Sequence, residues 1–417
     1  MDASFLIATT GGGASLGLPS PMTAAPPRLL LLATADARGH LMRGQLLYHA
    51  LRARGAQVSV LTTSDEGRRF LAEFGVPAAV LSRHYAVVFD SRQKMRPVPT
   101  DLRVITYFFL PWHMLRDIRR LAQEFPGVDL IVNDSFHPAL VVMGGLEPWR
   151  DRVVHVYGQS LRESLEENFT GRLWGPGARF FRWWVRFGLS RARGRLVHDF
   201  AFPLPASSDP ATPEHHLPTP LAVVAPGAGA GHPARKVAVY LNPHFSDPAL
   251  AEALETALRQ AGSIEGSEDG GVFLLGEGYA DRPGWRPYAN DWMEIAARAE
   301  LLVSAPGMAA LATAQALGKP MILIVTAQPE QQRNAGRAAT LGLLHRAVPW
   351  HERSTKEQFV ADFTRAHRDL RREIAAGRDR GQGAEQAHRS LRDRLDRWAD
   401  LLLAWASGQG GRNRTAR

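Results

Sequence analysis

The sequence predicts an α/β protein with two doubly wound parallel sheets, each forming its own domain. Three observations carry this prediction. The 417 residues are more than one core usually holds. Apolar runs of strand length alternate with amphipathic runs of helix length in both halves of the chain. A stretch rich in Pro, Gly and Ala separates the two halves at residues 203–233 and is expected to be a linker.

The clearest local signal is a strand–loop–helix–strand unit between Leu29 and Leu61. An apolar run opens the unit, a loop with Gly39 and His40 follows, and Gly55 ends the helix before the second strand. In open α/β sheets, ligands bind at the loops that follow the carboxyl ends of strands. His40 is therefore a candidate for proton transfer, because histidine changes charge near neutral pH.

The other elements continue this alternation. In the first half we expect strands at 76–81, 128–134 and 153–157, helices at 112–125 and 138–144, and a polar loop at 83–103. In the second half we expect strands at 237–241, 272–275, 301–304 and 321–325, and helices at 248–261, 292–299, 308–317 and within 354–405.

These elements define the expected domain organisation. It comprises a disordered leader at 1–27, a first domain at 28–202, the linker at 203–233, a second domain at 234–350, C-terminal helices at 351–406 and a disordered tail at 407–417.

Composition limits the possible partners. The chain has no cysteine, which excludes disulfides and thiolate metal sites, and the paired histidines near residue 215 lack a metal-ligand spacing. The net charge of +9 suits nucleotides or anionic head groups, although it could equally be a basic surface. We expect no membrane span and no nucleic-acid partner.

One basic aromatic segment, 180–196, interleaves Phe and Trp with Arg. Such a helix is typical of a segment lying on an anionic membrane surface. A domain helix with its aromatic stripe in the core would have the same pattern. Both interpretations stay open from the sequence.

Three strings point to a known family. GHLMRGQLLYHALRARGAQVSVL spans residues 39–61, DLIVNDSFHPAL spans 129–140, and LLVSAPGMAALATAQALGKPMILIVTAQPEQQRNAGRAATLG spans 301–342. Over residues 28–345 the chain resembles glycosyltransferases of the GT-B fold, in which two Rossmann-like domains face each other across a cleft. The resemblance is closest to the branch with UDP-sugar transferases and the lipid-linked N-acetylglucosaminyltransferase of cell-wall synthesis, and Gly-His-x-x-Arg favours a bacterial and archaeal group within it.

In the first domain this resemblance implies a catalytic pair. His40 would take the proton of an acceptor hydroxyl, and Asp134 would orient its imidazole. Gly39 would keep the backbone close to the ligand, and Arg43 would meet a phosphate or an acceptor anion. The alternative is that His40 is a loop histidine and Asp134 a helix cap.

In the second domain the resemblance implies a donor site. Gly307 would bring a diphosphate to a helix N-terminus, and Glu330 with Gln331 would bind sugar hydroxyls, while Asn334 fixes the helix that follows. The remaining donor-binding candidates are Met308 and Thr313. The alternative is that the Pro-Glu-Gln string only begins a helix.

Three positions depart from the family pattern. Thr313 stands where the family has a Glu that grips the ribose, Ala305 replaces a His near the diphosphate, and Ala310 replaces a small hydroxyl residue. Each lost hydrogen bond would weaken donor binding by about 0.5–1.5 kcal/mol. The donor is therefore either held differently or no longer bound.

We expect a metal-independent hexosyl- or N-acetylhexosaminyltransferase, without cofactor, that moves a sugar from a nucleotide sugar to an acceptor hydroxyl. A UDP-sugar is the favoured donor, and the acceptor is a small molecule or lipid-linked. The expected location is the cytoplasm, with attachment to the inner face of the membrane as one option. The alternatives are a noncatalytic binding protein with an eroded donor site and a nucleotide-sugar epimerase.

Overall fold

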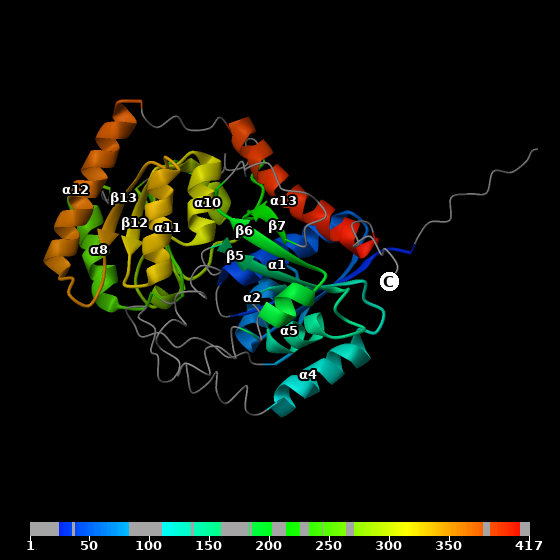
Figure 1. Ribbon diagram of the computed structural model, residues 1–417. Helices are drawn as coiled ribbons and strands as arrows, with labels where there is room; N and C mark the ends of the chain where they lie inside the picture. The colour runs from blue at the N-terminus through cyan, green and yellow to red at the C-terminus, as the bar shows by residue number, and fades with distance from the viewer. Residues whose placement is uncertain are drawn as a thin grey trace, which may run out of the picture.

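The structure is a computed structural model, shown in Figure 1. It describes residues 25–35, 38–82, 111–134, 137–159, 183, 186–201, 214–225, 233–243, 245–263, 271–377 and 384–408, and the statements below concern these residues.

The first domain is built on a seven-stranded sheet in the order β3-β2-β1-β4-β5-β6-β7. Its strands are β1 (Arg28–Ala33), β2 (Gln57–Thr62), β3 (Ala78–Val80), β4 (Leu130–Asp134), β5 (Val153–Gly158), β6 (Gly194–Asp199) and β7 (Glu214–Pro218). Its helices include α1 (Arg38–Ala53), α2 (Asp65–Glu73), α4 (Pro111–Glu124) and α5 (Pro138–Gly145). All the pairings between these strands are parallel, so their carboxyl ends meet at one edge of the sheet.

The second domain has a six-stranded parallel sheet in the order β10-β9-β8-β11-β12-β13. Its strands are β8 (Arg235–Leu241), β9 (Val272–Gly276), β10 (Trp285–Arg286), β11 (Ala299–Ser304), β12 (Met321–Val325) and β13 (His345–Pro349). Its helices are α8 (Pro248–Gln260), the 3₁₀ turn η1 (Glu277–Tyr279), α9 (Trp292–Arg298), α10 (Met308–Leu317), α11 (Pro329–Thr340) and α12 (Lys356–Ala375), and α13 (Ala384–Ala406) follows them.

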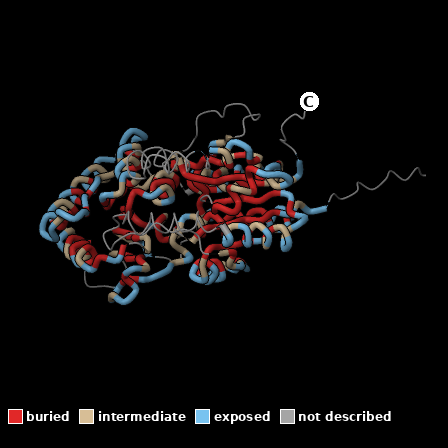
Figure 2. The backbone as a smooth tube through the Cα atoms, turned by 60° about the horizontal axis from the view of Figure 1, so that its bottom comes forward, coloured by how far each residue is buried: buried red, intermediate tan, exposed pale blue. Residues whose placement is uncertain are grey.

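Both sheets are buried on both faces, which is why central strands such as β1 and β12 are almost continuously apolar. In β1, Leu29 and Leu31 pack into one core cluster, whereas Leu30 and Leu32 pack into another on the opposite face. The two sheets thus have the doubly wound arrangement that the sequence predicts. Figure 2 shows the buried strands inside each domain and the exposed segments around them.

The last helix, α13, returns from the second domain to complete the core of the first. Trp398 and Trp405 lie in the same cluster as Leu29 and Leu31 of β1. The indole of Trp398 donates to the carbonyl of Pro218 at 2.7 Å. Figure 1 shows α13 running along the first domain. The C-terminal part of this helix therefore packs into the first domain, whereas Ala387 and Leu391 near its start pack into a core cluster of the second.

A buried arginine of α13 binds groups from both domains. Arg394 donates to the Phe200 carbonyl at 3.4 Å, just after β6, and to Gln315 Oε1 of α10 at 2.9 Å. Burial lowers the pKa of Arg394 to about 10, so the guanidinium stays charged at neutral pH. It links the end of β6 to the second domain.

Two ion pairs also cross between the domains. Arg38, at the start of α1, binds Glu277 of η1, which also accepts a hydrogen bond from the Tyr288 hydroxyl at 2.9 Å. Arg337 of α11 binds Asp199 at the end of β6. Both pairs lie where the carboxyl ends of first-domain strands meet the second domain.

The structure confirms the predicted fold class but moves several boundaries. Strand β7 lies inside the expected linker at 203–233, so the seventh strand belongs to the first sheet. Its sequence, EHHLP, has no β-branched residue and lies within a Pro-rich stretch, so the sequence did not predict a strand there. The expected leader, the loop at 83–103 and the expected tail lie largely outside the described residues, which begin at 25 and end at 408.

The basic aromatic segment 180–196 is not one helix. Residues 186–191 are helical, and Gly194 then begins the buried strand β6. Arg193 donates to the Asp151 carbonyl, and Arg195 pairs with Glu214 of β7. The sequence predicted one helix because the aromatic residues of this segment fall at helical spacing. The strand that follows has no alternating apolar pattern that would have revealed it. Residues 180–182, 184 and 185 lie outside the described part.

Truncation of Trp398 tests whether α13 stabilises the first domain. Because Trp398 is fully buried, Trp398→Ala should lower the free energy of unfolding by about 3–5 kcal/mol. Urea denaturation followed by far-UV circular dichroism measures the change. The control is Arg392→Ala, an exposed position on the same helix, which should change stability by less than about 0.5 kcal/mol. Equal small effects of both variants would show that α13 is dispensable.

Candidate active site

The structure brings His40 and Asp134 into contact. The sequence placed Gly39 and His40 in a loop, but α1 begins at Arg38, so both residues lie in the first turn of this helix. Asp134 is the last residue of β4, which pairs with β1 so that Ala33 lies beside Asp134. His40 Nδ1 is 2.9 Å from Asp134 Oδ1. The side chain of His40 is 19% exposed, so one edge of the imidazole remains accessible.

Arg43 binds the same carboxylate from one turn further along α1. Its Nε donates to Asp134 Oδ2 and its Nη2 to Asp134 Oδ1, both at 2.7 Å. The side chain is buried, with 5% exposure. The sequence suggested a phosphate or an acceptor anion as the partner of Arg43, and in the structure the carboxylate of Asp134 fills that place.

Two further residues that the sequence did not single out as site residues complete this cluster. Arg43 Nη1 lies 2.9 Å from His198 Nε2 at the end of β6, and His198 Nδ1 lies 3.0 Å from the Thr219 hydroxyl. An arginine can only donate, so His198 Nε2 accepts and His198 Nδ1–H donates to Thr219. His198 is therefore neutral, and it extends the cluster to the segment that leaves the first domain.

Charge and burial act in opposite directions on Asp134. Burial by itself raises the pKa of this carboxyl, but the positive charge of Arg43, followed by the interactions with His40, outweighs burial and holds the pKa well below its usual range. Burial and then the charge of Arg43 lower the pKa of His198 well below its ordinary value. At neutral pH the cluster thus has a charged carboxylate and guanidinium beside a neutral His198.

The N-terminus of α10 in the second domain lies beside this cluster. A Cβ added at Gly158, the last residue of β5, would lie 3.5 Å from the His198 ring and 3.6 Å from Met308 Cε. Gly307 caps α10 and is exposed, and a Cβ there would meet nothing within 4 Å. Space for a ligand therefore exists at the helix N-terminus that faces the first domain.

Asn334 and Gln331 support this region from α11. Asn334 Nδ2 donates to the Pro306 carbonyl at 2.9 Å and so ties α11 to the residue before Gly307. Gln331 Oε1 accepts from the backbone and hydroxyl of Thr326 at 3.1 and 2.9 Å. Both side chains are buried and fix the backbone around α10 and α11.

The other donor-binding candidates differ in their placement. Glu330 is partly exposed in the first turn of α11. Thr313 is buried, and its hydroxyl lies 3.6 Å from Met293 Sδ, so it points into the second-domain core rather than toward a ligand. Gly39 is exposed in the first turn of α1, and a Cβ there would meet nothing within 4 Å.

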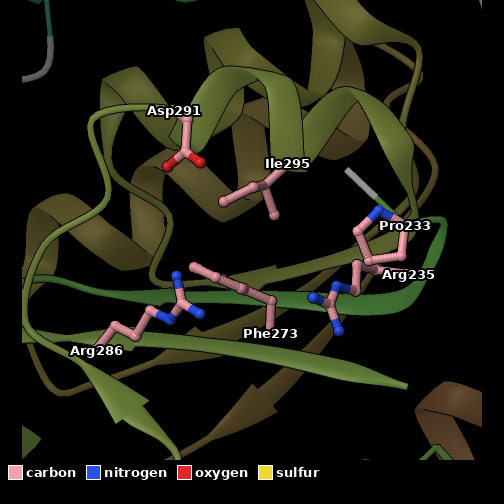
Figure 3. Close-up of a pocket in the computed structure, with 6 residues that line it drawn as sticks. All are labelled: Pro233, Arg235, Phe273, Arg286, Asp291 and Ile295. Atoms are coloured by element: carbon pink, nitrogen blue, oxygen red, sulfur yellow. The ribbon is translucent and has the colours of Figure 1, made fainter. Parts of the chain in front are cut away.

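Two hollows in the described residues lie away from this cluster. One of about 90 Å³ has Phe273 between Arg235 and Arg286, with Ile295 of α9 above the ring (Figure 3). The other, of about 190 Å³, lies at the opposite end of α10, beside Phe200. Neither is lined by His40, Asp134 or Glu330, so the candidate site is assigned from side-chain chemistry and not from a cavity.

Comparisons with known proteins place this geometry in a structural class. No family model and no curated protein sequence matches the chain. Among solved structures, it is similar to the glycotransferase of kitacinnamycin, with a TM-score of 0.59 and 18% identity over 91% of this chain and 99% of that one.

Two further similar structures were solved with a bound nucleotide. The spinosyn rhamnosyltransferase SpnG complexed with thymidine diphosphate gives a TM-score of 0.54 at 19% identity, over 90% of this chain and 99% of that one. The glycosyltransferase VinC in complex with dTDP gives 0.54 at 16% identity, over 91% and 100%. The chain therefore has the GT-B fold that the resemblance of its motifs predicted.

Acid should destabilise the protein in part through His198. The unfolded histidine binds a proton below about pH 6.5, whereas the folded His198 resists protonation, so its contribution to stability is full above that pH and is lost as pH falls. We expect His198→Gln to reduce the fall in unfolding free energy between about pH 7 and 5, by up to about 1.4 kcal/mol per pH unit.

Urea denaturation at a series of pH values measures this slope. The control is His49→Gln, an exposed histidine on α1, which should leave the slope unchanged. A His198→Gln slope equal to that of the wild type would mean that His198 is free to protonate in the folded protein.

Proposed function

We propose that the protein is a glycosyltransferase that moves a sugar from a nucleoside diphosphate sugar to an acceptor hydroxyl. The observation that carries the proposal is the contact of His40 with Asp134 at the edge of the first sheet, beside the N-terminus of α10. A base and an anion-binding helix end are the two parts that this reaction needs at one place.

The reaction follows from the roles of these groups. His40 Nε2 takes the proton of the acceptor hydroxyl while its oxygen forms a bond to the anomeric carbon of the sugar. The bond from that carbon to the phosphate oxygen breaks, and the nucleoside diphosphate leaves with the electron pair. The backbone N–H groups after Gly307 and the dipole of α10 offset the charge that develops on the diphosphate.

The proposal also limits the nucleotide and the sugar of the donor. Two similar structures contain thymidine diphosphate or dTDP, and the motif resemblance favours a UDP-sugar, so both nucleotides are candidates. The sugar would be a hexose or an N-acetylhexosamine. Because Thr313 points into the core, the ribose must be held by other groups than the residue at that position. No step in this scheme calls for a metal ion.

A noncatalytic protein of the same fold is the second candidate. It is favoured by the donor loop, where Ala305 and Ala310 provide no polar side chain and Thr313 is turned inward. Calorimetric titration with UDP and with thymidine diphosphate separates the two. Binding of either nucleotide supports the transferase, and binding of neither favours the noncatalytic protein.

A lipid-linked acceptor at a membrane surface remains a prediction. Within the described residues, no helix is long and apolar enough to span a membrane. In the basic aromatic segment, Trp183 is 58% exposed, and Arg186 and Arg191 are also exposed. These three side chains support a peripheral contact with an anionic membrane and a lipid-linked acceptor.

Replacement of the proposed base should stop turnover without affecting donor binding. His40→Ala should lower kcat by about 10²–10⁴-fold, because it removes the group proposed to take the acceptor proton. Donor affinity, measured by calorimetry, should change little. The control His49→Ala lies on the same helix and is exposed, so it should retain full turnover. Unchanged kinetics of His40→Ala would reject the assignment of the base.

Glu330→Ala should weaken binding of an intact sugar nucleotide more than binding of the bare nucleotide. Glu330 lies in the first turn of α11, where the resemblance places the group that reads sugar hydroxyls. Parallel calorimetric titrations with both ligands measure the difference. The matched control is Gln332→Ala, an exposed position in the same helical turn. An equal loss for both ligands would mean that Glu330 serves only the helix start.

A further inference from the structure

The side chain of Arg43 is held from two sides inside the first domain. Asp134 accepts from Nε and Nη2, and His198 accepts from Nη1. The side chain is 5% exposed. A guanidinium held in this way cannot swing out to a ligand without breaking all three contacts and leaving the buried carboxylate of Asp134 with His40 as its remaining partner.

Stability alone does not explain a buried ion pair at this position. The cost of removing two charges from water usually cancels most of their attraction, and apolar residues of similar size often do as well. What the pair adds here is geometry. Arg43 and His40 are three residues apart on α1 and share one face, so the guanidinium and the imidazole meet the same carboxylate.

The carboxylate determines which nitrogen of His40 carries a proton. Asp134 Oδ1 is 2.9 Å from His40 Nδ1 and 2.7 Å from Arg43 Nη2. An ionised carboxylate can only accept, so His40 Nδ1 must donate, and in the neutral imidazole Nε2 then keeps its lone pair. The approach of Arg43 Nη2 to Nδ1, at 2.9 Å, is then a contact between two donors that Asp134 Oδ1 holds together.

Arginine is suited to this task because its fork fixes both oxygens of the carboxylate. With Nε on Oδ2 and Nη2 on Oδ1, the carboxylate cannot rotate about its own axis. A lysine would keep the positive charge but would bind as a single point and leave that rotation free. His198, which is bonded to Thr219, prevents the guanidinium itself from turning.

We propose that Arg43 is a positioning residue that locks Asp134 in the one orientation in which His40 carries its proton on Nδ1 and presents Nε2 as the base. The proposal rests on the proposed function for the use of Nε2, but the state of the imidazole is a property of the resting protein. The base and the residue that orients its partner thus belong to the same helix turn.

Nuclear magnetic resonance of protein labelled with ¹⁵N at histidine tests this proposal directly. The ¹⁵N shifts of an imidazole distinguish the Nδ1–H form from the Nε2–H form, and His40→Gln identifies the signal of His40 by its loss. Wild-type His40 should be in the Nδ1–H form. Arg43→Lys should give a mixture of the two forms, because the charge remains but the fork is lost.

Two further variants complete the experiment. Arg43→Gln, which is uncharged and shorter, replaces Arg43→Lys if the latter does not fold, and should give the same mixture. The control is Arg394→Lys, which changes an arginine that is just as buried but lies on α13 away from His40. It should reduce thermal stability and leave the His40 signal in the Nδ1–H form.

Kinetics separates this proposal from the proposed function. Once a donor and an acceptor are identified, Arg43→Lys should lower kcat by about 10–10³-fold. KM for the donor should be unchanged, because the substitution alters only the tautomer of His40. An Nε2–H form in the wild type, or an unchanged Nδ1–H form in the Arg43 variants, would overturn the proposal. A mixture in Arg43→Lys, with no sugar transfer by the wild type, would leave Arg43 as a positioning residue and reject the transferase.

Discussion

The buried contact between Arg43 and Asp134 is the interaction on which the candidate site depends. It joins the first helix to the end of the fourth strand, and His40 and His198 both reach their positions through it. The parallel sheet makes this possible because β1 and β4 are neighbours that end at the same edge. A helix that starts directly after β1 therefore presents its first two turns to the carboxylate at the end of β4.

In the proposed site, the second domain would contribute backbone groups rather than charged side chains. Gly307 leaves the N-terminus of α10 open, and Asn334 fixes the residue before it from α11. The pairs Arg38–Glu277 and Arg337–Asp199 bind the two domains beside this region. Arg38 is two residues before His40, so the same end of α1 sets both the contact between the domains and the position of the proposed base.

Sequence periodicity predicted the elements whose cores are strongly apolar, such as β1, β4, α10 and β12, to within one or two residues. It missed β6 and β7, whose short, polar or Pro-containing sequences take their structure from pairing with neighbouring strands. His198 was not linked to the site for that reason, since its role is visible only once β6 is known to end beside β5.

The contact of His40 with Asp134 followed from motif resemblance. The partner of Arg43 could not be predicted, because helical spacing fixes which residues share a face but not which group lies opposite.

The position of α13 affects the order in which the protein can fold during synthesis. Trp398 and Trp405 fill the core of the first domain, and a Cβ at Gly194 would lie 2.5 Å from the Trp405 ring. These tryptophans leave the ribosome only after the whole second domain has been made. The first domain therefore cannot complete its core, at the face where α13 meets α1, β4 and β7, until translation reaches α13, although N-terminal domains usually fold first.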